Sequence, residues 1–429
     1  MDEVLILGAG LSGLGCALSL PNSRVFEATN HSGGHIYSHQ IESFYFDEGA
    51  HILHTKDPEL LKMIQGPGNE IVLIEQSNVA NFWHEHWLTY PIQNHLYELP
   101  LEHRIAALTD LVLAHINGEK RQPRNYLEWC RFQYGKYITE NFYAEYTTKY
   151  WRVPMESIAT DWFKGRLITS QIPRIIAGAF SPKDERQTIF AQYRYPARGG
   201  FYAFFQPFYD EINVTYNERA VEICPKEKMV IFASGRREYY NMLVSSLPLP
   251  DFVGMVKDIP PSIMEASALL HHTQLLCVNM VIKRPQLTRK HWFYIYDSDI
   301  EAARVSVPSN FTPPSKIKAV TALQAEIFRR WNETFEVDAI IERTVRDMGN
   351  LLKFDPASEL ITIKPIFVPY AYVIPDRERA AAVKGILEWF KERDIYCTGL
   401  FGRWKYIWSD EAFYSGVQTA DIIKSKNIE

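Results

Sequence analysis

Near the start of the chain stands Glu3-Val4-Leu5-Ile6-Leu7-Gly8-Ala9-Gly10-Leu11-Ser12-Gly13-Leu14, and this stretch predicts how the residues around it fold. Its apolar run, residues 4–7, is typical of a buried parallel strand. Gly8, Gly10 and Gly13 follow at the G-x-G-x-x-G spacing, and apolar residues then recur with a helical period. A strand, a glycine turn and a helix in this order direct free N–H groups and the positive end of the helix toward a pyrophosphate.

An acidic residue supports this interpretation. Glu27 directly follows a second short strand-like run, residues 24–26. An acid at the end of the second strand suits the ribose hydroxyls of an adenosine. The pattern therefore predicts that the chain binds a dinucleotide, and the alternative is a glycine-rich turn with only a structural role.

A second pair of glycines, Gly33 and Gly34, favours FAD over NAD. The pair follows Glu27 after a short polar loop. This arrangement resembles the second half of the fingerprint found in flavoproteins of the amine-oxidase and protoporphyrinogen-oxidase superfamily. In that superfamily the backbone of the glycine pair runs beside the flavin phosphates, so the resemblance implies FAD as the cofactor. An NAD enzyme does not need the second pair.

Composition excludes several classes of partner. The net charge is −5, with no block of basic residues, which argues against nucleic acid or an anionic membrane as a main partner. The five cysteines are scattered and form no C-x-x-C motif, so we expect a reducing, cytoplasmic environment. No signal-peptide pattern precedes the first strand. No apolar run approaches the ~20 residues of a spanning helix, so no membrane span is expected.

The order of strand-like and helix-like segments predicts an α/β protein: a Rossmann-type FAD-binding domain with a helical insertion and an antiparallel substrate sheet. We expect the FAD-binding domain to be discontinuous, because its segments lie at the start, the middle and the end of the chain. The expected ranges are 1–55, 193–250 and 365–429 for the FAD-binding domain, 56–192 for a mainly helical substrate domain, and 251–364 for an antiparallel sheet plus a helix. Within the last range, residues 326–352 are predicted to be helical.

The aromatic segment Phe142-Tyr143-Ala144-Glu145-Tyr146-Thr147-Thr148-Lys149-Tyr150-Trp151 resembles the Y-T-x-K-x-W segment of UDP-galactopyranose mutases. The resemblance implies that Phe142 and Tyr146 contact the uridine and that Trp151 lines the sugar site. The spacing agrees, because residues four apart share a helix face and two rings there form a stacking platform for a planar base. The alternative is an aromatic stripe buried in the core.

Further segments match the same family in the same order along the chain. They are residues 49–55, 90–94, 193–201, 303–308, 369–375 and 399–406. The resemblance implies that His51 lies beside the flavin and that Arg304 and Tyr406 contact the substrate diphosphate. It also places Tyr193 and Tyr372 at the substrate.

We therefore predict Arg304, His51, Tyr372 and Tyr406 as the catalytic residues. The resemblance also implies that Gly402, in the closing segment, contacts the FAD.

One departure from the family concerns a second substrate arginine, which the family carries after a tryptophan. Here Thr169 stands at the best-aligned position after Trp162. Lys164, Arg166 and Arg174 are the candidates to replace that arginine, and the sequence does not choose among them. The departure weakens the prediction of the sugar more than that of the cofactor.

The histidines do not indicate a metal site. His84 and His86 are two apart and His51 and His54 are three apart, but no third ligand follows at a metal-binding spacing. We therefore predict no metal, and the absence of G-x-S-x-G gives no support to serine hydrolysis.

The resemblance implies an FAD-dependent pyranose/furanose mutase of a nucleotide-activated sugar, active in glycan biosynthesis. In that family reduced flavin attacks the anomeric carbon through N5, displaces the nucleotide, and the sugar ring opens and recloses. The reduced form would thus be active, and NAD(P)H or another reductant would reduce the flavin.

Two alternatives stay open. One is an FAD-dependent oxidase or dehydrogenase of the amine-oxidase or protoporphyrinogen-oxidase type. The other is a flavin-binding protein without catalytic activity within a glycan pathway. An oligomer is compatible with the sequence, which leaves the sugar and the nucleotide open.

Overall fold

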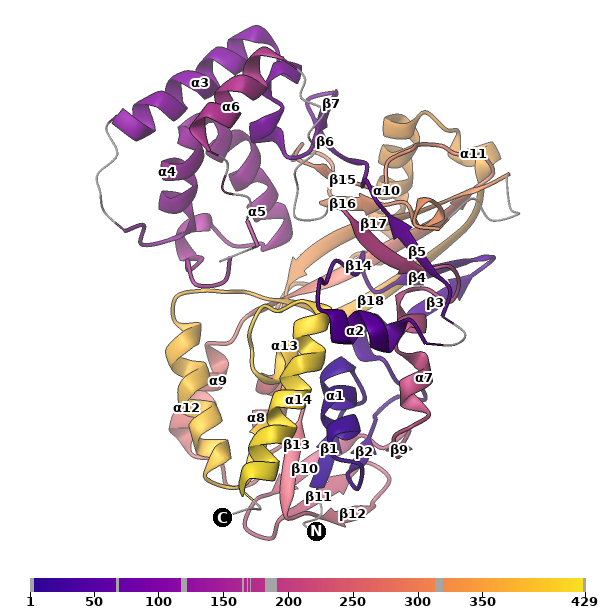
Figure 1. Cartoon of the computed structure of the whole chain (residues 1–429), viewed down its shortest axis with the longest axis vertical. Helices are drawn as coiled ribbons and strands as arrows, with labels where there is room; N and C mark the ends of the chain where they lie inside the picture. The colour runs from indigo at the N-terminus through magenta and orange to yellow at the C-terminus, as the bar shows by residue number, and fades with distance from the viewer. Residues whose placement is uncertain are drawn as a thin grey trace.

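The computed structural model describes most of the chain, and its elements form three groups (Figure 1). The described residues are 4–66, 69–116, 122–163, 166–167, 169, 171–181, 191–312 and 319–426. In the view of Figure 1, a small parallel sheet with its helices fills the lower half, a group of helices lies at the upper left, and a long sheet lies at the upper right.

The lower group contains a five-stranded sheet built from distant parts of the chain. Its order is β19-β13-β1-β2-β9, and all four pairings are parallel. The strands are β1 (Val4–Leu7), β2 (Arg24–Phe26), β9 (Val214–Thr215), β13 (Met242–Ser245) and β19 (Ile395–Cys397). All four side chains of β1 are buried, as expected for a central strand covered on both faces. This sheet confirms the predicted α/β fold with a Rossmann-type core.

Helices and a small antiparallel sheet complete the lower group. The helices are α1 (Leu11–Ser19), α7 (Gln206–Tyr209), α8 (Leu249–Gly254), α9 (Pro261–Ala268), α12 (Arg379–Lys391), α13 (Gly399–Gly402) and α14 (Ser409–Lys426). The small sheet has β10 (Ala220–Cys224), β11 (Met229–Phe232) and β12 (Arg237–Tyr239). Helices α1 and α14 lie side by side (Figure 1). Their backbones are so close that a Cβ added at Gly15 would come within 2.2 Å of the Phe413 carbonyl oxygen. The C-terminal helix thus supports the helix that follows the glycine turn.

The long sheet has seven strands in the order β18-β14-β17-β16-β15-β6-β7. They are β6 (Val79–Trp83), β7 (His86–Thr89), β14 (His272–Ile282), β15 (Trp292–Ile295), β16 (Arg304–Ser306), β17 (Thr321–Arg330) and β18 (Leu360–Val373). All pairings are antiparallel except that of β15 with β6. Apolar side chains of α10 (Val337–Leu352) pack against one face of the sheet, and α11 (Pro356–Glu359) precedes β18. Side chains of the other face pack against the rest of the chain.

The observed strands differ from two of the predicted domain boundaries and from one predicted helix. Strands β6 and β7 come from the range predicted as mainly helical, and β18 extends from 360 into the range assigned to the FAD-binding domain. All three strands pair with strands of the long sheet. Residues 326–330, predicted as helix, continue β17, because their backbone pairs with β14 along its length. The predicted helix begins only at Val337.

The upper left of Figure 1 holds the helical insertion, which lies next to the long sheet. Its helices are α3 (Leu101–Ile116), α4 (Tyr126–Ile138), α5 (Glu145–Tyr150) and α6 (Ile172–Phe180). The remaining elements are α2 (Pro58–Ile64) and two strand pairs, β3 (Ser38–Ile41) with β4 (Phe44–Asp47) and β5 (Ile71–Ile74) with β8 (Tyr193–Pro196). In the described part of the chain, every helix is too short or too polar to cross a membrane.

Candidate functional site

The glycine turn has the close contacts that its spacing predicts. Gly8 has a φ of +96°, which side chains rarely adopt, and a Cβ added at Gly13 would lie 2.1 Å from the Gly8 carbonyl oxygen. Helix α1 therefore starts directly on the turn. Gly10 is its N-cap and provides no side-chain hydrogen bond, so first-turn N–H groups can serve a bound phosphate.

The acid and the second glycine pair lie on this turn. Glu27 accepts a hydrogen bond from the Ala9 N–H at 2.8 Å, and the Gly33 N–H donates to the Ala9 carbonyl at 2.8 Å. A Cβ added at Gly34 would lie 3.2 Å from the Gly10 Cα. The two halves of the sequence fingerprint thus form one cradle, with the acid at one side of it.

The space in front of Gly10 suits a pyrophosphate. A Cβ added there would meet no atom of the described residues nearer than 4.0 Å, in contrast to the crowded Gly13. Gly402 of α13 packs behind the cradle, because its added Cβ would lie 2.8 Å from the Ser245 carbonyl oxygen at the end of β13. The direct contact of Gly402 with the cofactor stays a prediction.

Arg304 lies in the middle of a row of side chains that crosses the long sheet. On the neighbouring strands it stands opposite Tyr294 of β15 and Glu326 of β17. Its Nε and Nη2 atoms donate to the two carboxylate oxygens of Glu326 at 3.0 and 2.8 Å, and Nη2 also lies 3.5 Å from the Tyr372 hydroxyl. Burial is the largest single effect and disfavours the charge, but Glu326 and the nearby tyrosines together outweigh it and raise the pKa of Arg304 above its ordinary value. The guanidinium is therefore charged and held in one plane.

Aromatic side chains from three parts of the chain gather around this arginine. The rings of Tyr146 and Tyr150 on α5 stack with centroids 5.2 Å apart, and Tyr150 lies 4.8 Å from Tyr372 of β18. Tyr406, before α14, lies 5.8 Å from Tyr372 and 5.6 Å from Trp151. Burial raises the pKa of Tyr146, Tyr150 and Tyr406, so their hydroxyls keep their protons. Four predicted substrate residues thus meet at the predicted diphosphate arginine.

His51 lies next to this row of side chains, because the turn that carries it is hydrogen-bonded to Glu326. Its Nδ1 is 3.0 Å from the Gly49 carbonyl oxygen, and the Ala50 N–H donates to Glu326 at 2.9 Å. Burial lowers the pKa of His51 to about 4, so the imidazole is neutral at pH 7. The neutral ring donates from Nδ1 and keeps Nε2 as an acceptor. Its contact with the flavin stays a prediction.

Two predicted substrate residues have other surroundings. Phe142 is 1% exposed and packs between Trp83 and Tyr296, at 5.2 and 5.3 Å. Tyr193 of β8 is fully buried, and its ring contacts Trp292 at 5.7 Å. Neither ring lies in the tyrosine group around Arg304. Phe142 is thus buried against Trp83 of β6 and against Tyr296, which directly follows β15, and its contact with the uridine stays a prediction.

Arg166 reaches the tyrosine group, and this bears on the missing second arginine. Its guanidinium carbon lies 5.4 Å from the ring centroid of Tyr406 and 4.5 Å from that of Trp408. Its Nη2 donates to both carboxylate oxygens of Glu411, at 2.9 and 2.7 Å. Stacking on two rings and a paired carboxylate hold this cation next to a predicted substrate residue.

The other candidates for this role are placed differently. Thr169 is exposed, and Arg174 belongs to α6 of the helical insertion. Lys164 lies outside the described residues. Of the candidates that the structure describes, Arg166 is the one whose ring contacts include Tyr406.

Sequence reasoning missed several side chains of this site. Glu326 was missed because it was predicted to lie in a helix. A single acid among the mostly apolar residues 321–328 was nevertheless a signal for a buried partner. Tyr150 lies within the aromatic segment but received no role. Trp162 served only as an alignment point, yet its ring lies 5.6 Å from Tyr406 and its buried indole N–H has no partner among the described residues.

The histidines named in the sequence lie apart from any metal-type cluster. His84 is exposed and near Asp297, at 3.5 Å, and His54 packs against Trp408 at 4.2 Å. Within the described ranges, no three side chains of His, Cys, Asp or Glu form a group suited to a metal ion.

Comparison with known proteins identifies the class of protein to which the chain belongs. Residues 11–375 match the family model described as flavin containing amine oxidoreductase, so the chain belongs to this family and its cofactor is a flavin. The cradle at the glycine turn agrees with a dinucleotide form of that cofactor.

Solved structures narrow the fold. A crystal structure of reduced UDP-galactopyranose mutase superposes with a TM-score of 0.90 at 23% identity, covering 99% of this chain and 96% of that chain. The chain therefore has the fold of UDP-galactopyranose mutase, as the sequence resemblance predicted.

Other similar structures carry different names. A putative protoporphyrinogen oxidase from Exiguobacterium sp. 255-15 has a TM-score of 0.75 at 13% identity, covering 99% of both chains. A CLA-producing fatty acid isomerase from P. acnes has a TM-score of 0.67 at 12% identity, covering 98% of both chains. Because one fold serves these differently named proteins, the activity must be argued from the site.

Proposed function

We propose that this protein is an FAD-dependent pyranose/furanose mutase acting on a nucleotide-activated sugar. The observation that carries the proposal is the grouping of Tyr146, Tyr372 and Tyr406 with Arg304. A charged guanidinium and several protonated hydroxyls suit a diphosphate, which accepts charge-assisted hydrogen bonds. In a mutase the nucleotide leaves the sugar and later returns, so it must be held while detached.

The cofactor would be held by groups already in place. Glu27 would bind the adenosine ribose, and the first-turn N–H groups of α1 would bind the pyrophosphate beside Gly10. Bound FAD in its reduced form would supply the nucleophile for the exchange at the anomeric carbon. NAD(P)H or another reductant would maintain that form.

The side chains of the protein would bind the substrate and orient it. Glu326 holds the Nε and Nη2 atoms of Arg304, so the guanidinium presents a fixed plane to the diphosphate and needs little reorganisation. Arg166 would supply a second cation by exchanging its contact with Glu411 for a phosphate oxygen. The neutral His51 would accept or donate a hydrogen bond at the flavin without adding charge.

The alternative is an oxidase or dehydrogenase, which the match to amine oxidoreductases favours. It uses the same cradle, but it gives no role to a charged arginine within a group of protonated tyrosines. Hydride transfer needs an oxidised flavin at the start, whereas the mutase needs a reduced one. The redox state therefore separates the two functions.

The test is an assay of the purified protein with UDP-sugars in both redox states. With dithionite and without oxygen, we expect interconversion of the substrate with an isomer of identical mass, over many turnovers per flavin. The oxidised protein should be nearly inactive. Turnover that requires oxidised flavin, consumes oxygen and yields a product lighter by two hydrogens would establish the oxidase instead.

A further inference from the structure

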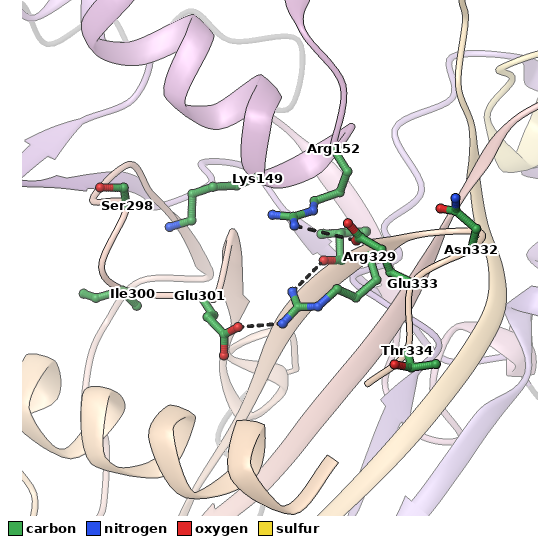
Figure 2. A pocket seen from close by; sticks show the side chains of 10 residues that line it. Lys149, Arg152, Ser298, Ile300, Glu301, Arg329, Asn332, Glu333 and Thr334 are labelled. Atoms are coloured by element: carbon green, nitrogen blue, oxygen red, sulfur yellow. Dashed lines mark hydrogen bonds and ion pairs between the residues drawn. The ribbon is translucent and has the colours of Figure 1, made fainter. Parts of the chain in front are cut away.

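A pocket lies beside the C-terminal end of α5, and Figure 2 shows it from close by. Its volume is about 610 Å³, within the usual range for small-molecule sites. The charged residues that line it are Lys149, Arg152, Glu301, Arg329 and Glu333. Phe328 also lines it and contacts Tyr150 at 4.8 Å, so one ring separates this pocket from the proposed substrate site.

Lys149 is buried at the wall of this pocket. Its Nζ donates to the backbone carbonyls of Ile295 and Asp297, at 3.0 and 2.9 Å. A neutral amine has two N–H bonds and one lone pair, so the two carbonyls match its donors and the lone pair is not used by these hydrogen bonds. In Figure 2 the amine end of Lys149 lies near Ser298 and Ile300.

The surroundings shift the amine toward its neutral form, so that a large share of it is neutral at pH 7. Burial lowers the pKa of Lys149 to about 7, although nearby acids raise it in part. These acids are Asp297, Asp299, Glu145 and Asp347. Across the pocket, Arg152 and Arg329 oppose the ammonium form, whereas Glu301 and Glu333 favour it. A buried lysine with an available lone pair is the usual nucleophile toward carbonyl compounds.

Arg152 is available to bind an anion. Its Nη2 lies 3.6 Å from a carboxylate oxygen of Glu333, a loose ion pair, and its buried Nε has no partner among the described residues. Arg329, by contrast, is held by Glu301 at 2.6 Å. An anionic group in the pocket would meet Arg152 first, since its side chain is 31% exposed and its pairing with Glu333 is loose.

We propose that this pocket binds a small carbonyl compound with a phosphate or carboxylate group, and that Lys149 captures it reversibly. The amine nitrogen adds to the carbonyl carbon, and the resulting carbinolamine loses water to form an imine. The carbonyl oxygen leaves with the two amine hydrogens, so no oxidant or reductant is needed. Arg152 binds the anionic end. This site is independent of the mutase function.

The experiment uses pyridoxal 5′-phosphate as the anionic aldehyde and pyridoxal as the same aldehyde without its phosphate. The intact flavoprotein is treated at pH 7, the imine is reduced with borohydride, and the labelled lysines are identified by peptide mass spectrometry. Lys384 on α12 is the internal comparison, because its side chain is 75% exposed. We expect Lys149 to be labelled by pyridoxal 5′-phosphate at least about tenfold faster than Lys384, since ordinary lysines are almost fully protonated at pH 7.

Two variants test the parts separately. Lys149→Arg should lose the fast label, and Arg152→Gln should slow labelling by pyridoxal 5′-phosphate about fivefold or more while leaving labelling by pyridoxal unchanged. Equal labelling of Lys149 and Lys384 in the unaltered protein would overturn the proposal, and this comparison holds even if a variant fails to fold. The proposal would also be overturned if Lys149 were labelled equally fast by pyridoxal 5′-phosphate and by pyridoxal, and equally fast in Arg152→Gln. The anion site would then be absent.

Discussion

Arg304 and Glu326 face each other on adjacent antiparallel strands and form a two-point ion pair, with Nε and Nη2 of the arginine at 3.0 and 2.8 Å from the two carboxylate oxygens. The carboxylate is fully buried, and it also accepts a hydrogen bond from the Ala50 N–H. A buried charge that loses its partner is costly, so this pair links stability to the proposed substrate site.

The first prediction separates these two roles. Arg304→Ala should lower the free energy of unfolding by about 3 kcal/mol, because Glu326 is left as an unpaired buried charge. Arg304→Ala combined with Glu326→Gln should recover much of that loss but should not recover UDP binding. Urea unfolding and calorimetric titration with UDP measure the two effects. Unchanged UDP affinity in both variants would remove Arg304 from the substrate site.

The second prediction compares two glycines of the cradle. Gly13→Ala should destabilise the protein even without cofactor, because its Cβ would lie 2.1 Å from the Gly8 carbonyl oxygen. Gly10→Ala has no contact within the described residues nearer than 4.0 Å and should leave the cofactor-free protein stable. Its methyl group should instead occupy the approach of the pyrophosphate and reduce flavin content. Cofactor absorbance and unfolding of the cofactor-free protein are the measurements, and full flavin content in Gly10→Ala would contradict the proposed cradle.

The third prediction concerns pH. Burial lowers the pKa of His51 to about 4, below the ~6.5 of an unfolded chain. Its contribution to stability is therefore fully present above pH 6.5 and is lost as the pH falls toward 4, by on the order of 3 kcal/mol.

His51→Asn keeps an N–H donor for Gly49 but cannot titrate in this range. Urea unfolding at pH 7 and pH 4.5 should show a smaller acid-induced loss of stability in this variant than in the unaltered protein. His84→Asn, at an exposed position, should behave like the unaltered protein. Parallel pH profiles for all three proteins would mean that His51 is not buried in its neutral form.

The fourth prediction identifies the second cation of the substrate site. Arg166→Ala should weaken UDP binding by about 2 kcal/mol, because a charge-assisted contact with the diphosphate is lost. Arg174→Ala is the matched control, since this arginine lies on α6, and it should bind UDP normally. Titration of both variants with UDP gives the answer, and a loss confined to Arg174→Ala would reverse the assignment.

The glycine cradle and the order of the family segments follow from the residue types alone. The G-x-G-x-x-G turn is local: a strand, three glycines and a helix lie within about twenty residues, and their steric needs appear directly in the residue types. The acid Glu27 and the pair Gly33-Gly34 follow within the same unit. The resemblance of the later segments then predicted the fold that the comparisons confirm.

Contacts between residues that are distant in the sequence depend on the tertiary structure. Glu326 became the partner of Arg304 because β16 and β17 pair in one register, and a one-residue shift would have turned Glu326 to the opposite face. Arg166 is the candidate for the second cation because its guanidinium lies over the ring of Tyr406, a contact between distant parts of the chain. Phe142, in the insertion, is buried because Trp83 of β6 and Tyr296, which directly follows β15, pack against it. Local residue patterns do not encode such pairings, since they depend on strand register and on how separate layers pack.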